Sequence, residues 1–145
     1  MSGMASLYQE VILDLSKRPH GKGLEEGAAA SDHQLNPTCG DEVTVQLHLD
    51  GDRLRAIRWT GEGCAISQAS ASILADLAPG LQPSDLAQRI ELFRTAMRSK
   101  GRIEPDEELL GDAVALGGVS KYTARVKCAM LPWVAAEAAL AQLPR

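Results

Sequence analysis

Residues 43–59 read VTVQLHLDGDRLRAIRW, and apolar residues alternate with polar ones on both sides of a glycine-containing turn. Alternation with a period of two is typical of a half-buried strand. Asp50-Gly51-Asp52 supplies residues that favour a tight turn between two such strands. The stretch therefore predicts an antiparallel hairpin with strands over residues 43–49 and 54–59.

Stretches with helical periodicity flank this hairpin on both sides. Apolar residues three or four positions apart are typical of an amphipathic helix. This spacing predicts helices over residues 5–16, 65–77 and 84–98, and a proline-acidic start at residue 105 predicts a shorter helix to about residue 116. Gly117-Gly118 is expected to end the short helix.

Two further expectations concern the last helix and the segment before the hairpin. A helix that begins near Cys128 would hold Pro132 in its first turn, where proline is tolerated, so we expect the last helix to start there. Residues 20–36 are rich in glycine, alanine, serine and charged residues. This composition predicts a mobile surface segment.

Length and composition limit the classes of protein that the chain can represent. A chain of 145 residues with this order of elements is expected to form one α+β domain over residues 1–145, with residues 1–4 either a cloning remnant or disordered. No stretch approaches the roughly 20 apolar residues of a membrane span, so we expect a cytoplasmic protein without a membrane partner. The net charge of −4, with charges of both signs interspersed, disfavours nucleic acid as a partner.

The chain has three cysteines, each beside glycine or charged residues rather than within an apolar run. An odd number in a reducing compartment argues for metal binding or thiol reactivity over disulfides. Cys39 and Asp41 flank Gly40, and a tight loop would turn both side chains toward one ion. With Cys64 and Cys128 they form a candidate four-ligand metal site, whose donors suit zinc and iron equally.

The positions of the cysteines in the predicted helices indicate how the pKa values of their thiols are shifted. Cys64 and Cys128 are both expected at helix N-termini, which lower the pKa of a thiol. Arg125 precedes Cys128 by one helical turn, so it is expected to stabilise that thiolate or to pair with Asp41. The three histidines are expected at the surface: His20, His33 and His48.

Three motifs around the cysteines resemble those of a known family. They are NPTCGD at residues 36–41, GEGCAIS at residues 61–67 and KCAML at residues 127–131. Their order and neighbours are similar to those of the IscU/NifU N-terminal family of iron–sulfur assembly proteins, and the resemblance covers residues 7–140. Lys127 stands where scaffold-type members have a histidine immediately before the third cysteine. The helix predicted at residues 84–98 resembles an insertion between the second and third cysteines. The chaperone-binding motif Leu-Pro-Pro-Val-Lys, which precedes the third cysteine in scaffold-type members, is absent here. In these three respects the chain resembles the zinc-dependent SufU branch of the family.

The resemblance implies a fold, a cofactor and partners. The implied fold is an α+β domain with a small antiparallel sheet of about three strands, packed by helices on one side. The implied function is a Zn²⁺-bound sulfur acceptor that takes persulfide sulfur from the cysteine desulfurase SufS, stimulates it, and passes the sulfur to downstream Suf assembly proteins. Such a protein is a sulfurtransferase-type acceptor rather than a classical turnover enzyme, and Cys39 is the expected carrier.

Two alternatives stay open at this point. The same Cys and Asp ligands could assemble a [2Fe-2S] cluster, in which case the protein would be a scaffold. A protein of another class, a zinc-stabilised interaction domain without thiol transfer, would also contain such a site.

Overall fold

The computed structural model describes residues 3–144, with side chains from Tyr8 to Pro144. Its elements are α1 (Gly3–Lys17), β1 (Ala30–Leu35), β2 (Glu42–Asp50), β3 (Arg53–Glu62), α2 (Ala65–Leu77), α3 (Pro83–Arg98), α4 (Glu107–Leu110), the 3₁₀ helix η1 (Gly111–Lys121) and α5 (Thr123–Leu140). The expectation for residues 1–4 falls partly on Met1 and Ser2, outside the described residues, and α1 begins at Gly3. No helix in residues 3–144 is long and apolar enough to cross a membrane.

Three antiparallel strands form the sheet in the order β1-β2-β3. The predicted hairpin is confirmed as β2 and β3. The third strand, β1, lies inside residues 20–36, so the expectation of a mobile surface segment is wrong for that part. Only Ala30 of β1 is buried, because β1 lies at the edge of the sheet. Its other side chains are exposed or half-buried. Its sequence therefore shows no apolar alternation.

The residues that lead from α1 to β1 are also held against the sheet. The Gly23 amide donates to the Trp59 carbonyl at 2.7 Å, and the Trp59 amide donates to the Gly21 carbonyl at 3.0 Å. The Trp59 indole donates to the His20 carbonyl at 2.7 Å. These bonds attach residues 20–23 to β3, where Lys22 and Trp59 form a parallel bridge.

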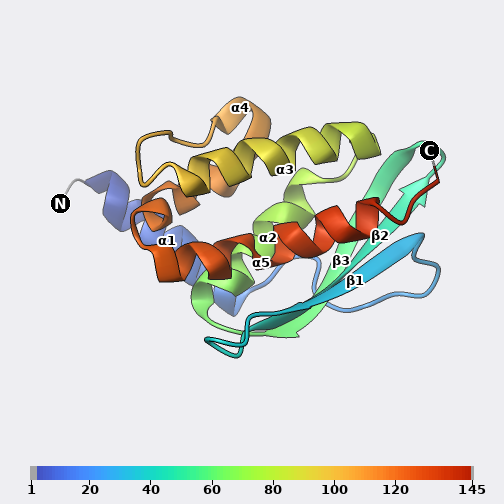
Figure 1. Cartoon of the computed structure of the whole chain (residues 1–145), viewed down its shortest axis with the longest axis horizontal. Helices are drawn as coiled ribbons and strands as arrows, with labels where there is room; N and C mark the ends of the chain where they lie inside the picture. Colours follow the sequence, from blue (N-terminus) through green and yellow to red (C-terminus); the bar gives the residue numbers. More distant parts are fainter. Residues whose placement is uncertain (1–2, 145) are drawn as a thin grey trace.

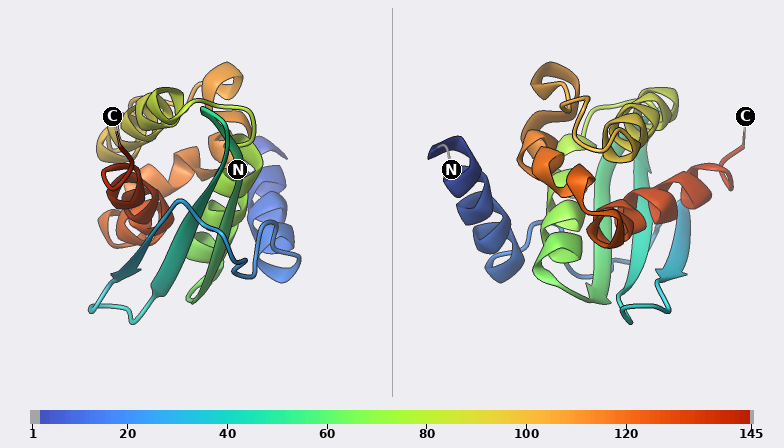
Figure 2. Two further views of the ribbon diagram at one scale, coloured as in Figure 1. Left: turned by 90° about the vertical axis from the view of Figure 1, so that its right-hand side faces the viewer. Right: turned by 60° about the vertical axis from the view of Figure 1, so that its left-hand side comes forward.

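Helices cover one face of the sheet (Figures 1 and 2). Helix α5 packs on β1 and β2, α2 packs on β3, and α1 and α3 lie outside α2 and α5. The predicted α+β class, with three antiparallel strands and helices on one side, is confirmed. At the centre, the rings of Phe93 and Trp133 stack with centroids 4.1 Å apart, and neither side chain is exposed.

The C-terminal third differs from the prediction in two ways. Helix α5 begins at Thr123 and continues through Pro132, so the expectation that it starts near Cys128 is wrong. Proline inside a helix costs about 3 kcal/mol, and here the fully buried Trp133 beside it provides offsetting packing. Likewise, Gly117-Gly118 does not end the preceding helix, which continues as η1 to Lys121.

Candidate metal centre

Cys39 lies in the loop that joins β1 to β2. The Asn36 amide donates to the Asp41 carbonyl at 2.8 Å, and the Gly40 amide donates to the Asn36 carbonyl at 2.8 Å. The Asn36 side chain accepts a further bond from the Thr38 amide at 3.1 Å. Gly40 has a φ of +78°, a left-handed conformation that favours glycine. The loop therefore forms a closed hairpin connection, and it leaves the Cys39 side chain exposed.

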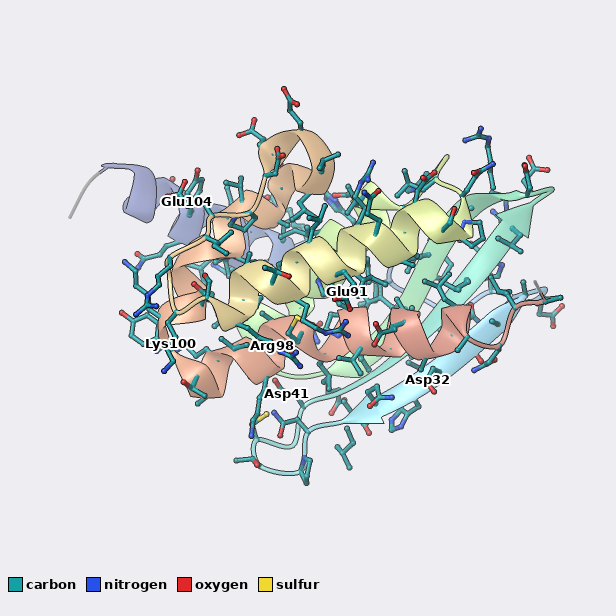
Figure 3. All side chains as sticks on the ribbon, turned by 45° about the horizontal axis from the view of Figure 1, so that its top comes forward. Asp32, Asp41, Glu91, Arg98, Lys100 and Glu104 are labelled. Atoms are coloured by element: carbon teal, nitrogen blue, oxygen red, sulfur yellow. The ribbon has the colours of Figure 1, made fainter. Side chains whose placement is uncertain are left out.

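Asp41 is buried on the side of this loop that faces α5 (Figure 3). Its Oδ1 accepts a hydrogen bond from the Cys64 amide at 3.2 Å. Among the residues that the structure describes, no group forms a hydrogen bond with its Oδ2. A Cβ atom at Gly63 would lie 2.8 Å from the Asp41 Cγ, so only glycine leaves room for the carboxylate. A buried carboxylate oxygen without a partner is costly, and a bound cation would satisfy it.

Three of the four predicted ligands lie together. The ligand atoms of Cys39, Asp41 and Cys128 are all within 4.8 Å of one another. The Cys39 and Cys128 sulfurs are 3.9 Å apart. Two thiolates bound at about 2.3 Å to one tetrahedral zinc ion would lie roughly 3.8 Å apart, so the spacing of these sulfurs fits zinc.

Cys64, the fourth predicted ligand, is placed beside this group rather than within it. It caps the N-terminus of α2, as the sequence predicted, and it is exposed. Its sulfur lies 3.9 Å from the Ser67 hydroxyl, which donates to the Cys64 carbonyl at 3.1 Å. Cys64 thus contributes its backbone amide to Asp41, and its thiol stays a predicted ligand.

The electrostatic setting of Cys128 differs from the expectation. Burial raises the pKa of the Cys128 thiol strongly, and the nearby carboxylate of Asp41 and thiol of Cys64 raise it further. A lowered pKa was expected because the sequence placed Cys128 at a helix N-terminus, and that expectation is wrong. The residue lies in the second turn of α5, one turn beyond the N-terminal amides that would stabilise a thiolate.

Arg125 does not reach the carboxylate. Its guanidinium lies over the Tyr122 ring at 5.1 Å from the ring centre. Within residues 3–144 it forms no ion pair with Asp41 or any other carboxylate. Its effect on the Cys128 thiolate, one turn along α5, therefore stays a prediction.

The histidines lie away from the cluster. His20 and His33 are exposed as expected, and they contact Asp76 and Glu42. His48 is buried, so the expectation that it lies at the surface is wrong. Its side chain stays on the polar face of β2, where its Nε2 lies 3.0 Å from the Gln46 side-chain oxygen, and the segment before β1 lies on the same face, because the Glu25 amide donates to that oxygen.

Two further polar residues at the site were not predicted from the sequence. Asn36 and Ser67 are buried polar residues, and they bond to the loop and to the α2 N-cap respectively. Both lie inside the cysteine motifs at residues 36–41 and 61–67. That position was the available signal, because a buried polar residue in such a motif must bond to its neighbours.

The known proteins that this chain resembles are iron–sulfur cluster assembly proteins and their relatives. The profile of the NifU-like N-terminal domain matches residues 7–129. The zinc-dependent sulfurtransferase SufU of Bacillus subtilis (strain 168) is 39% identical over 142 residues, covering 97% of this chain and 94% of that protein. The iron–sulfur cluster assembly scaffold protein IscU of Streptococcus pyogenes serotype M1 is 36% identical, covering 97% and 86%. A crystal structure of a SUF-system scaffold protein from Fervidobacterium islandicum AW-1 has a TM-score of 0.76 at 36% identity, covering 95% and 99%.

Proposed function

The chain belongs to the NifU-like N-terminal domain family of iron–sulfur cluster assembly proteins, and we propose that it is a zinc-dependent sulfur acceptor for the cysteine desulfurase SufS. The observation that carries the proposal is the pairing of an exposed Cys39 with a buried, unpartnered Asp41 oxygen in one cluster. The exposed thiol can meet a partner, and the buried oxygen favours a resident cation.

The residues proposed to hold zinc are Cys39, Asp41, Cys64 and Cys128. Thiolate and carboxylate donors suit this metal, and the spacing of the Cys39 and Cys128 sulfurs supports it. Bound zinc would supply positive charge that keeps the thiols deprotonated and protects them from oxidation. Without such a charge, burial would keep Cys128 protonated.

The proposed transfer is a thiol–disulfide type of exchange at Cys39. The Cys39 thiolate attacks the outer sulfur of the persulfide on the desulfurase cysteine, and a new S–S bond forms on Cys39. The original S–S bond breaks, and the desulfurase cysteine leaves as a thiolate. Cys39 is suited to this step because it is exposed on a loop, whereas Cys128 is buried in α5. Arg125, one turn before Cys128, is proposed to favour the thiolate form there.

The wider setting of the proposal follows from the chemistry of the thiols. A persulfide on Cys39 is a sulfur donor, so downstream Suf assembly proteins would receive it. Free cysteines persist in a reducing compartment, so we place the reaction in the cytoplasm.

A second candidate function is a scaffold that assembles a [2Fe-2S] cluster on the same ligands. The similarity to the Streptococcus pyogenes IscU supports it. Three thiolates and a carboxylate could also hold two iron ions with bridging sulfide. This function predicts bound iron and visible absorption after reconstitution, where the zinc function predicts a colourless protein.

The deciding experiment measures desulfurase turnover with zinc-loaded protein, metal-free protein and a Cys39→Ser variant. We expect stimulation only by the zinc-loaded wild type, and mass spectrometry should find one added sulfur atom on Cys39. Thr38→Ala is the matched control, because only the Thr38 backbone amide bonds within the loop.

Two results would contradict the proposal. Iron in place of zinc in the purified protein would favour the scaffold function. Full stimulation by Cys39→Ser would instead identify a zinc-stabilised interaction domain that acts without thiol transfer.

A further inference from the structure

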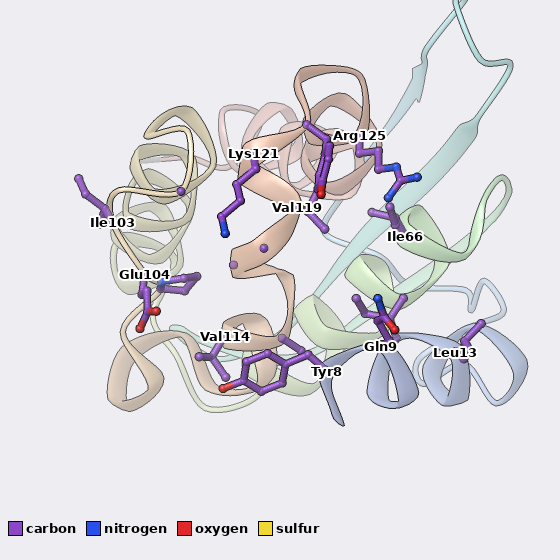
Figure 4. A pocket seen from close by; sticks show the side chains of 17 residues that line it. Tyr8, Gln9, Leu13, Ile66, Ile103, Glu104, Val114, Val119, Lys121 and Arg125 are labelled. Atoms are coloured by element: carbon purple, nitrogen blue, oxygen red, sulfur yellow. The ribbon is translucent and has the colours of Figure 1, made fainter. Parts of the chain in front are cut away.

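A cleft of about 850 Å³ opens between α1 and η1 (Figure 4). Its walls are mostly apolar and come from α1, α2, η1 and the loop between α3 and α4; they include Ile12, Ile66, Val114 and Val119. Its volume is within the range of protein sites that take a ligand or a peptide segment. The proposed sulfur transfer does not use this cleft.

Exposed apolar side chains gather around the cleft. Leu13, Ile103 and Tyr122 are about half exposed and all line it. Only two other large apolar side chains in the described part of the chain are as exposed. Exposed apolar residues grouped around a cleft are typical of an interaction site.

Positive charges stand at the same place. Lys121 and Arg125 line the cleft, and Figure 4 shows the Lys121 ammonium directed into it. Gly101 also lines the cleft and lies against the Lys121 side chain. Two further cations, Lys100 and Arg102, flank Gly101 in the sequence. Within residues 3–144 none of these four cations forms an ion pair. They are unpaired in a chain whose net charge is −4.

The cleft is adjacent to the candidate metal centre. Ile66, on its wall, is two residues from Cys64 at the start of α2. Arg125, at its edge, precedes Cys128 by one turn of α5. A segment bound in the cleft would therefore bring the rest of its protein to the metal centre.

We propose that this cleft docks an apolar segment of the cysteine desulfurase that carries acidic residues. The proposal rests on the proposed function, which makes the desulfurase the partner at the metal centre. Acidic side chains would pair with Lys121 and Arg125, and apolar side chains would fill the space between α1 and η1. A nucleic acid would satisfy the cations but not the aliphatic walls. Glu104, which Figure 4 shows on the opposite side from Arg125, would face the apolar part of the segment.

The test measures desulfurase turnover against increasing concentrations of zinc-loaded wild type and Lys121→Glu proteins at low and high salt. We expect Lys121→Glu to raise the half-saturating concentration about tenfold at low salt, because charge complementarity controls association. The maximal turnover and the zinc content should not change. Lys17→Glu is the matched control: it also reverses an exposed lysine in a last helical turn, but it lies outside the cleft.

A second variant, Ile103→Asp, tests the apolar component and should also raise the half-saturating concentration. Equal half-saturation for Lys121→Glu, Ile103→Asp and Lys17→Glu would overturn the docking proposal alone. Absence of stimulation by the wild type would instead contradict the proposed function. If both variants had the half-saturating concentration of the wild type, but Lys121→Glu bound a single-stranded oligonucleotide more weakly than the wild type, the cations would be assigned to nucleic acid and the docking proposal would also be overturned.

Discussion

The two oxygens of Asp41 have different surroundings. Oδ1 accepts a hydrogen bond from the Cys64 amide, whereas Oδ2 is buried and has no hydrogen-bond partner within residues 3–144. An asparagine can retain the first bond, but its amide nitrogen cannot bind a cation in place of Oδ2. The isosteric change therefore separates the loop's structure from its proposed metal ligand.

We expect Asp41→Asn to fold and to lose zinc affinity by at least about tenfold. In the metal-free state its stability should equal or exceed that of the wild type, because the buried unpaired charge is removed. Competition with a chelator measures the affinity, and urea unfolding measures the stability. Asp76→Asn, at an exposed carboxylate that contacts His20, should bind zinc as the wild type does. Unchanged affinity in Asp41→Asn would exclude Asp41 as a ligand.

His48 is the other residue whose burial has a measurable consequence. Burial lowers its pKa, and Arg55 lowers it further; Glu25 acts in the opposite direction and Arg58 in the same direction as Arg55. The Nε2 atom lies 3.0 Å from the Gln46 side-chain oxygen. Because the folded pKa is below the unfolded value of about 6.5, the unfolded chain binds more protons as the pH falls through that value.

The metal-free protein should therefore lose stability as the pH decreases from about 7.5 to about 5.5. In His48→Gln, this loss should be smaller. Urea unfolding at both pH values in the presence of a chelator measures it. An identical dependence in wild type and His48→Gln would show that His48 does not titrate on folding.

At this level the sequence predicted which residues lie together better than it predicted their environment. The cysteine motifs identified Cys39, Asp41 and Cys128, which lie together in the structure. The burial of Cys128 could not be predicted, because it depends on where α5 begins. The burial of His48 could not be predicted either, because it depends on the segment before β1, whose Glu25 amide bonds to Gln46 beside His48 on the polar face of β2.

Helices α2 and α5 are joined by a buried hydrogen-bond pair. The Ser70 hydroxyl of α2 donates to the Ala129 carbonyl of α5 at 2.5 Å and accepts from the Trp133 indole at 2.8 Å. Pro132 has no amide hydrogen to donate to the Cys128 carbonyl, so this turn of α5 lacks one of its own bonds. Ser70 therefore helps to set the distance between the helices that carry Cys64 and Cys128.

We expect Ser70→Ala to weaken zinc binding and to change the absorption spectrum of the Co²⁺-substituted protein. It should also reduce stability by about 1–3 kcal/mol, because it leaves a buried donor and acceptor unpaired. Ser72→Ala provides a matched control: Ser72 is equally buried on α2, but its bonds go to His20, Leu15 and Gln68. A similar loss of stability with an unchanged spectrum is expected there. Identical Co²⁺ spectra for Ser70→Ala and wild type would limit Ser70 to a role in folding.

Elements with a clear period were predicted closely. The hairpin and the helices α2 and α3 are at the predicted positions, because their apolar residues repeat with the period of the element. β1 was missed because it is a polar edge strand. The start of α5 was misplaced because Pro132 is a strong local signal, and tertiary packing around Trp133 overrides it.

The candidate metal site joins parts of the molecule that are distant in the sequence. Cys39 and Asp41 come from the β1–β2 loop, Cys64 from the start of α2 and Cys128 from α5. The apolar core that α5 forms with the sheet does not include these ligands apart from the buried Cys128. The fold should therefore persist without metal, at lower stability.

We expect removal of zinc by a chelator to lower the melting temperature while the far-ultraviolet circular dichroism stays that of a folded protein. Free zinc at about 1,000 times Kd would contribute about 4 kcal/mol, or roughly 10 °C for a chain of this size. In Cys128→Ser, the chelator should have little effect. Unfolding on chelation would make zinc a requirement for folding, and an unchanged melting temperature in wild type would argue against a metal site.

Helix α5 follows every other described element in the chain, yet it supplies Cys128 and fills the centre of the sheet's covered face. During synthesis, Cys39, Asp41 and Cys64 therefore leave the ribosome before Cys128, the last of the proposed ligands. Until then the nascent polypeptide has an incomplete set of ligands and an uncovered sheet. Zinc can therefore bind the complete set of proposed ligands only after α5 has been synthesised and has packed on the sheet.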